Sequence, residues 1–113
     1  MPTDEEWLKL ADLFGGVYQP PKLIDTTSGK SAYNALIAGG SSGFSVLLGG
    51  LRLIRSNPRF YGLGDYASYW SATQNSSDEA WYYNFNRYRG ELSRANTKKT
   101  LGLSCRCVQD LII

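Results

Sequence analysis

The first part of the chain carries apolar residues at helical spacing. They fall at i, i+3, i+4 and i+7 and share one helical face: Trp7, Leu10, Ala11 and Phe14. Thr3 and Glu6 form a capping-box pattern before this face, and a pair of glycines follows it. The pattern predicts an amphipathic helix over about residues 4–14, with Trp7 and Phe14 as core anchors. A second, short helix is expected around residues 31–37.

After residue 43 the period of the apolar residues changes from about 3.6 to 2, which is typical of strands. The segments with this period cover residues 44–48, 51–54, 68–73, 80–86 and 101–108, and a short strand is expected over residues 90–94. Helices first and strands afterwards favour an α+β fold over a doubly wound one. We therefore predict one or two helices on the N-terminal side, followed by a mostly antiparallel, loop-rich sheet.

Composition fits one small folded domain. The chain has 113 residues, of which 42% are hydrophobic and 19% charged, so residues 1–113 are expected to build one core without a metal or a disulfide. No run approaches the roughly 20 apolar residues that span a bilayer, and no secretory signal precedes the first helix. We expect no membrane span. Because the predicted helix begins so early, we expect an abrupt mature start or a missing N-terminal edge.

Most aromatic residues lie between Phe60 and Tyr88. Alternation divides one strand there into two faces, with Trp81, Tyr83 and Phe85 on one and Tyr82, Asn84 and Asn86 on the other. Trp81 and Phe85 are expected in the core. The second face is either solvated sheet surface or a contact surface, since Tyr, Asn, Ser and Arg suit both roles. The ligand-binding set predicted on this outer surface is Tyr82, Asn84, Asn86, Tyr88, Arg89, Ser93, Arg94 and Asn96.

Basic residues gather in the same part of the chain, where Glu91 is the single acidic residue between Arg87 and Arg106. Such a cluster can bind nucleic acid, but it is more often a solvated hairpin, and a net charge of +2 is small for a nucleic-acid partner. We expect no nucleic-acid binding.

The residues for common catalytic sites are missing or poorly placed. The chain has no histidine, so neither a Ser-His-Asp nor a Cys-His arrangement can form. Four carboxylates lie in polar, turn-like sequence: Asp65, Asp78, Glu79 and Glu91. Cys105 and Cys107 are two residues apart, which in a strand separates their Cβ atoms by about 6.7 Å, too far for a disulfide. We expect no enzyme activity, no metal and no cofactor.

The chain resembles the Fibrobacter succinogenes major paralogous domain, a family whose fold is similar to that of C-type lectins. The motifs that carry the resemblance, in order, are PTDEEW at residues 2–7, GFSVLLGGLR at 43–52, FYGLG at 60–64, YWSAT at 69–73, AWY at 80–82, Lys99 and GLSCRCV at 102–108. The resemblance implies a C-type-lectin-like fold. It also implies a secreted or cell-surface bacterial protein and a display scaffold like the variable proteins of diversity-generating retroelements.

Three departures from the family pattern limit what the resemblance implies. The family usually carries a cysteine-containing segment before the helix, which this sequence does not include, so we expect Cys107 to be without its usual partner. Cys105 stands where an apolar residue is usual, and we interpret it as a small buried residue. The calcium and sugar motifs of true C-type lectins do not occur, so calcium-dependent sugar binding is not expected.

Three functional hypotheses follow. The leading one is a recognition module, a monomer or weak oligomer, that binds a glycan or a surface protein through its C-terminal strands. The alternative is a structural or assembly module of a bacterial envelope protein. The third is an oxidase related to the formylglycine-generating enzymes, suggested by the two cysteines but with a different cysteine spacing.

Overall fold

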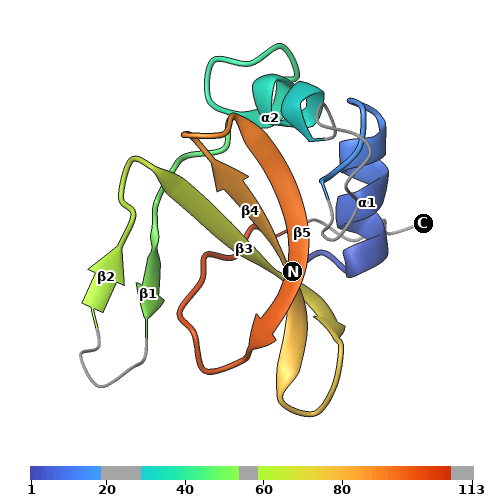
Figure 1. Ribbon diagram of the computed structural model, residues 1–113. Helices are drawn as coiled ribbons and strands as arrows, with labels where there is room; N and C mark the ends of the chain where they lie inside the picture. Colours follow the sequence, from blue (N-terminus) through green and yellow to red (C-terminus); the bar gives the residue numbers. More distant parts are fainter. Residues whose placement is uncertain (19–28, 54–58, 108–113) are drawn as a thin grey trace.

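The computed structural model describes residues 1–18, 29–53 and 59–107. Within these ranges two helices precede five strands (Figure 1): α1 Asp4–Asp12, α2 Lys30–Leu36, β1 Leu51–Leu53, β2 Arg59–Tyr61, β3 Tyr66–Gln74, β4 Glu79–Asn86 and β5 Glu91–Lys98. All strand pairs that form ladders are antiparallel. The α+β architecture predicted from the order of the patterns is confirmed.

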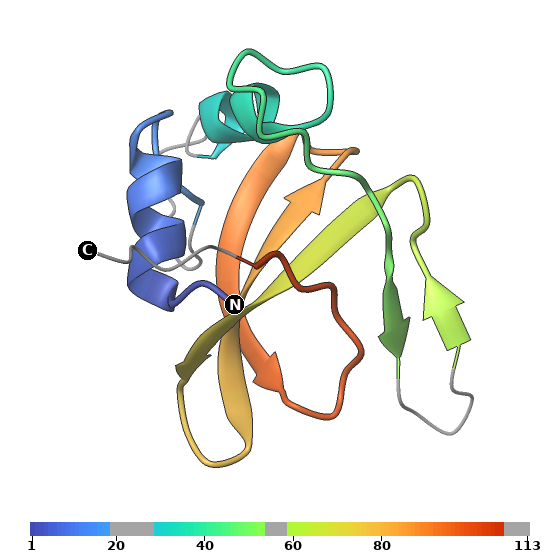
Figure 2. The ribbon, with the colours of Figure 1, turned by 180° about the vertical axis from the view of Figure 1, so that it is seen from behind.

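The strands form two sheets. β3, β4 and β5 follow one another in a three-stranded sheet, and β1 and β2 form a separate two-stranded one. The two opposite views agree that α1 and the β1–β2 pair lie on opposite sides of the larger sheet (Figures 1 and 2). The larger sheet thus has a helix-facing side, covered by α1, and an outer face on the side of β1–β2.

The core lies between the helices and the helix-facing side. In α1 the capping box predicted for Thr3 and Glu6 is present, and both of its hydrogen bonds form. Trp7 is 2% exposed and stacks on Tyr83, with ring centroids 5.1 Å apart. Phe85 and Leu92 are fully buried beside them. Phe14 is only partly buried but packs against this cluster.

Two predicted strands are not continuous. Within residues 44–48 only Val46 pairs, in an isolated bridge with Ile37, and residues 101–107 form isolated bridges at Gly102 and Ser104. Ile54 and Val108, at the ends of two predicted strands, lie outside the described residues. The pattern did not predict β2. Residues 44–48 and 101–107 alternate between apolar and polar positions as a strand does. Alternation shows which residues share a face, but it does not show how many backbone hydrogen bonds a segment makes with a neighbouring strand.

Two burial predictions are wrong. Trp81 is half-buried rather than part of the core, because the guanidinium of Arg94 lies 3.6 Å from its ring centroid and takes the place of apolar neighbours. Cys105 is exposed, as is Cys107, and both thiols are free. Their segment pairs with β1 through a single bridge at Gly102 and with β3 through a single bridge at Ser104, so it is not covered as an inner strand would be. None of the described helices is long and apolar enough to cross a membrane.

Candidate functional site

The outer face is built by alternate residues of three strands. Across β3 and β4, Ser68 faces Asn84 and Trp70 faces Tyr82. Across β4 and β5, Asn84 faces Ser93, and Ala80 faces Thr97. Because residues two apart share a face, the cross-strand register brings hydroxyl, amide and aromatic side chains from distant positions together.

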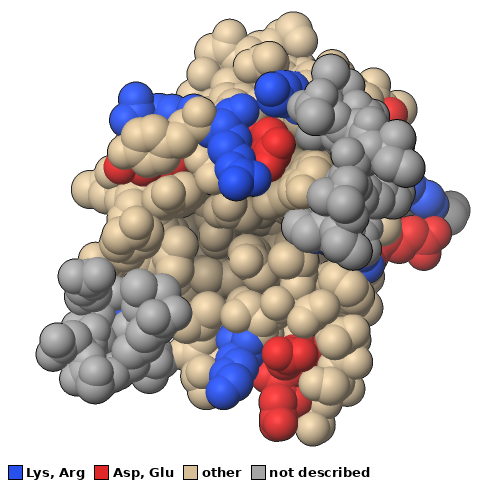
Figure 3. All heavy atoms as spheres, viewed as in Figure 1, with Lys and Arg blue, Asp and Glu red and all other residues tan. Residues whose placement is uncertain are grey.

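A cleft of about 330 Å³ opens over this face. Besides the three strands of the larger sheet, residues of β1, of β2 and of the segment after β5 line it. In the space-filling view the middle of this face is hollow and carries no Lys, Arg, Asp or Glu, and charged side chains lie above and below the hollow (Figure 3). The lining residues are Leu51, Tyr61, Tyr66, Ser68, Tyr82, Asn84, Thr97, Leu101 and Leu103.

The floor of the cleft presents uncharged polar atoms. Ser68 Oγ donates a hydrogen bond to Asn84 Oδ1 at 2.9 Å. Within the described part of the chain, no hydrogen bond is found for the Asn84 side-chain nitrogen, the Tyr82 hydroxyl or the Thr97 hydroxyl. Burial raises the pKa of Tyr82, so its hydroxyl stays protonated and able to donate well above neutral pH.

Stacked tyrosines form one wall. The rings of Tyr61 and Tyr66 stack with centroids 5.8 Å apart, and Tyr88 leans on Tyr66 at 6.0 Å. Gly62 has a φ of +79°, and a Cβ there would collide with the Tyr66 ring. Glycine at this turn therefore permits the ring packing that shapes the wall.

One ion pair lies at the rim of the cleft beside the stacked tyrosines, and a second lies at the turn between β4 and β5. Arg87 donates to Asp65 Oδ1 at 2.7 Å and 3.3 Å, and these hydrogen bonds hold the pKa of the Asp65 carboxyl below its usual value. Arg89 lies 3.6 Å from the nearly buried carboxylate of Glu91. A lowered pKa keeps Asp65 ionised, the reverse of what a general acid needs.

The predicted site residues do not form one surface. Tyr82 and Asn84 line the cleft, and Ser93 lies beside Asn84 on the same face. Asn86 stabilises the turn after β4, because its Oδ1 accepts hydrogen bonds from the backbone N–H groups of Tyr88 and Arg89. Those two residues are exposed in the turn between β4 and β5.

Arg94 and Asn96 lie on the opposite side of the sheet from Tyr82, so their grouping with it is corrected. Arg94 pairs across the sheet with the fully buried Tyr83 and forms two hydrogen bonds with the Asp4 carboxylate, at 2.8 Å and 2.6 Å. Tyr83 donates to the same carboxylate at 2.6 Å. Burial opposes the charge of Asp4, but the bonds from Arg94 and Tyr83 outweigh it and lower the pKa of that carboxyl. This cluster fastens α1 to the sheet.

Several cleft residues were not predicted. Ser68 and Tyr66 belong to a predicted strand or its flank, whereas Tyr61, Thr97 and the leucines come from segments that reach the cleft only in the folded chain. The sequence shows that Tyr66, Ser68 and Trp70 alternate and therefore share one face of β3. Whether this is also the face of Tyr82 depends on the register of the β3–β4 hairpin.

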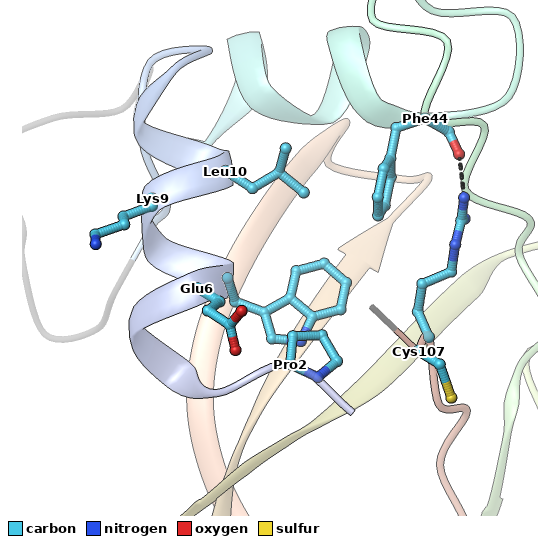
Figure 4. A pocket seen from close by; sticks show the side chains of 8 residues that line it. Pro2, Glu6, Lys9, Leu10, Phe44 and Cys107 are labelled. Carbon is cyan, nitrogen blue, oxygen red and sulfur yellow. Dashed lines mark hydrogen bonds between the residues drawn. The ribbon is translucent and has the colours of Figure 1, made fainter. Parts of the chain in front are cut away.

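A second pocket, of about 370 Å³, lies on the helix side (Figure 4). It is mostly apolar, and its polar groups are largely engaged: Glu6 closes the capping box, and Arg106 donates to the Phe44 carbonyl at 2.8 Å. Trp7 Nε1 is buried without a partner among the described residues. Cys107, the last residue of the described range 59–107, is part of its lining.

Side chains that could bind a metal ion do not cluster in the described ranges. No group of three or more His, Cys, Asp or Glu side chains gathers there in a way that suits a metal ion. The cleft itself is lined by none of these residue types.

The family model described as the Fibrobacter succinogenes major domain matches residues 1–109. No curated protein and no solved structure matches the chain. The C-type-lectin-like assignment therefore stays a prediction.

Proposed function

The chain belongs to the Fibrobacter succinogenes major domain family, and on this premise we propose that it is a non-enzymatic recognition module. It binds a glycan or a protein in the cleft of the outer face. One observation carries the proposal: the cleft combines tyrosine rings and leucines with the Asn84 side-chain nitrogen and the Tyr82 and Thr97 hydroxyls, for which the described part of the chain offers no hydrogen-bond partner.

This combination suits binding. Ligand pockets are mostly apolar, with a few polar groups that set orientation, and their volumes run from roughly 300 to 1,000 Å³. A cleft of about 330 Å³ lies at the lower end of that range. Tyrosine adds rigid contact area at little cost in side-chain entropy.

Tryptophan fluorescence tests the proposal, because Trp70 contacts Tyr82 edge-on, with ring centroids 6.5 Å apart, and reports on the cleft. The protein is titrated with plant and bacterial polysaccharides and with extracts of surface proteins. We expect a saturable change that Tyr82→Ala abolishes. Leu13→Ala, which truncates a side chain 77% exposed on the helix side, is the control and leaves binding intact. A response that survives Tyr82→Ala contradicts the assignment of the cleft.

The proposal includes a location outside the cell or on its surface and a C-type-lectin-like fold whose outer face varies between copies. Both rest on the family resemblance. Fractionation of the native bacterium with an antibody to this domain tests the location, and a purely cytosolic signal refutes it.

A structural or assembly module is the second candidate. The exposure of Phe60 and Leu63, both 83%, favours it, because large exposed apolar side chains in one neighbourhood often mark contacts between proteins. Light scattering at rising concentration tests this candidate. Growth in mass that Phe60→Ser removes supports it, and a constant monomer mass refutes it.

A further inference from the structure

We propose that the ligand of the cleft is an uncharged carbohydrate, bound without a metal ion. This inference rests on the proposed function, since it names the chemistry that the same cleft recognises.

The first argument is charge. All residues that line the cleft are uncharged. Near the turn between β4 and β5, Arg87 pairs with Asp65 and Arg89 with Glu91. A carboxylate, phosphate or ammonium group that entered the hollow would lose water without gaining an opposite charge, which is unfavourable. The cleft therefore selects against acidic sugars, phosphorylated ligands and charged peptide side chains.

The second argument is hydrogen bonding. The Asn84 side-chain nitrogen donates only, whereas the hydroxyls of Tyr82 and Thr97 can both donate and accept. A purely apolar ligand would cover these groups and leave them unsatisfied, which costs about 1–3 kcal/mol for each buried group. Sugar hydroxyls also donate and accept, so they match this set without a net charge.

The third argument is the distribution of apolar surface. Leu51, Leu101 and Leu103 and the tyrosine rings surround the polar atoms of the floor. A sugar ring has C–H faces and a hydroxyl edge, so it fills an apolar wall and a polar floor together. A typical protein partner buries about 800 Å² on each side. A hollow of about 330 Å³ fits a small unit of a ligand better than a broad protein surface.

The fourth argument concerns metals. Sugar recognition through a hard cation such as calcium depends on carboxylate or carbonyl oxygen ligands. The cleft lining has no Asp or Glu, and its one side-chain amide oxygen, Asn84 Oδ1, accepts a hydrogen bond from Ser68. Binding through the cleft should therefore be unaffected by a chelator.

The test is calorimetric titration, once in EDTA and once in calcium, with neutral tetrasaccharides of glucose, mannose and xylose and, in parallel, with tetragalacturonate. We expect saturable binding of at least one neutral sugar and none of tetragalacturonate. Asn84→Ala should weaken that binding about tenfold or more, and Tyr82→Phe, which keeps the ring, about threefold or more. Asn34→Ala, at an exposed position on α2, is the matched control and leaves affinity unchanged. Near-ultraviolet circular dichroism confirms that each variant is folded.

Four results would overturn the inference: tighter binding of tetragalacturonate, loss of binding in EDTA, an unchanged affinity in Asn84→Ala, or no binding of any sugar. A selection of displayed peptides on the wild type, with counter-selection on Tyr82→Ala, separates this failure from that of the proposed function. Peptides that need Tyr82 would retain recognition through the cleft and reject the carbohydrate. If neither sugars nor peptides need Tyr82, the proposed function fails as well.

Discussion

Tyr82 and Tyr83 are neighbours in β4, yet they belong to two different parts of the molecule. Tyr83 is fully buried on the helix-facing side, stacked on Trp7, with its hydroxyl bound to Asp4. Tyr82 is half-buried on the outer face, where it lines the cleft, and no hydrogen bond to its hydroxyl is found among the described residues. The same residue type thus holds the fold together on one face and remains available to a ligand on the other.

The two faces differ in how far their polar side chains are hydrogen-bonded within the protein. On the helix-facing side, Asp4, Arg94 and Tyr83 satisfy one another at distances of 2.6–2.8 Å. On the outer face, Asn84 is satisfied at one end only. Substitutions on the first face should change stability, and those on the second should change binding.

Truncation of Trp7 should have the largest effect. Trp7→Ala removes the ring that stacks on Tyr83 and leaves a cavity, which typically costs about 3–5 kcal/mol. Tyr82→Ala should cost less than half as much, because its ring is half-exposed. Urea unfolding measures both, and similar losses would contradict the contrast between the two faces.

Removal of one hydroxyl sharpens the comparison. Tyr83→Phe deletes the hydrogen bond to the Asp4 carboxylate and should lower the free energy of unfolding by about 1.5–3 kcal/mol. Tyr82→Phe is the matched control, since it deletes a hydroxyl without a described partner and should change stability by less than about 0.5 kcal/mol. The comparison fails if Tyr82→Phe is the more destabilising of the two.

Acid should weaken the helix-facing side. The pKa of Asp4 in the folded protein lies below the value of about 3.9 of an unfolded aspartate, so ionised Asp4 stabilises the fold at neutral pH. This contribution is complete above the unfolded pKa and is lost as the pH falls through the folded one. Urea unfolding between pH 5 and pH 2 should show a decline that Asp4→Asn reduces; an identical decline in the variant would be evidence against the role of Asp4.

Loss of the Asp65–Arg87 ion pair at the rim of the cleft should have the smallest effect on stability. Asp65 and Arg87 are exposed enough that salt and water screen their attraction. We expect Asp65→Asn to change the melting temperature only slightly, and the change to disappear in 1 M NaCl. A large shift that persists in salt would show that this pair supports the cleft wall.

Local patterns predicted the elements that make their own contacts. The capping box and helical spacing at Trp7 specified α1, and alternation in β4 placed Tyr82 and Asn84 opposite Tyr83 and Phe85, as the structure has them. These features depend on residues a few positions apart, so the sequence alone carries them.

Features that depend on distant pairing were not predictable. Arg94 lies on the helix-facing side because the hairpin register pairs it with Tyr83, and a shift of one residue would move it to the cleft. Cys105 looks like an inner residue of a strand, but single bridges leave its segment uncovered. The cleft has the same origin, since Thr97 and Tyr61 meet only when separate segments fold together.

Chemical-shift mapping tests the central claim most directly. The ¹⁵N-labelled protein is titrated with the neutral tetrasaccharide that binds most tightly, and amide shifts are followed along the chain. The largest chemical-shift changes should occur at the amides of Ser68, Tyr82, Asn84 and Thr97. The amide chemical shifts of α1 and α2 should remain unchanged. Changes concentrated in the helices, with an unaffected outer face, would contradict the assignment of the cleft as the binding site.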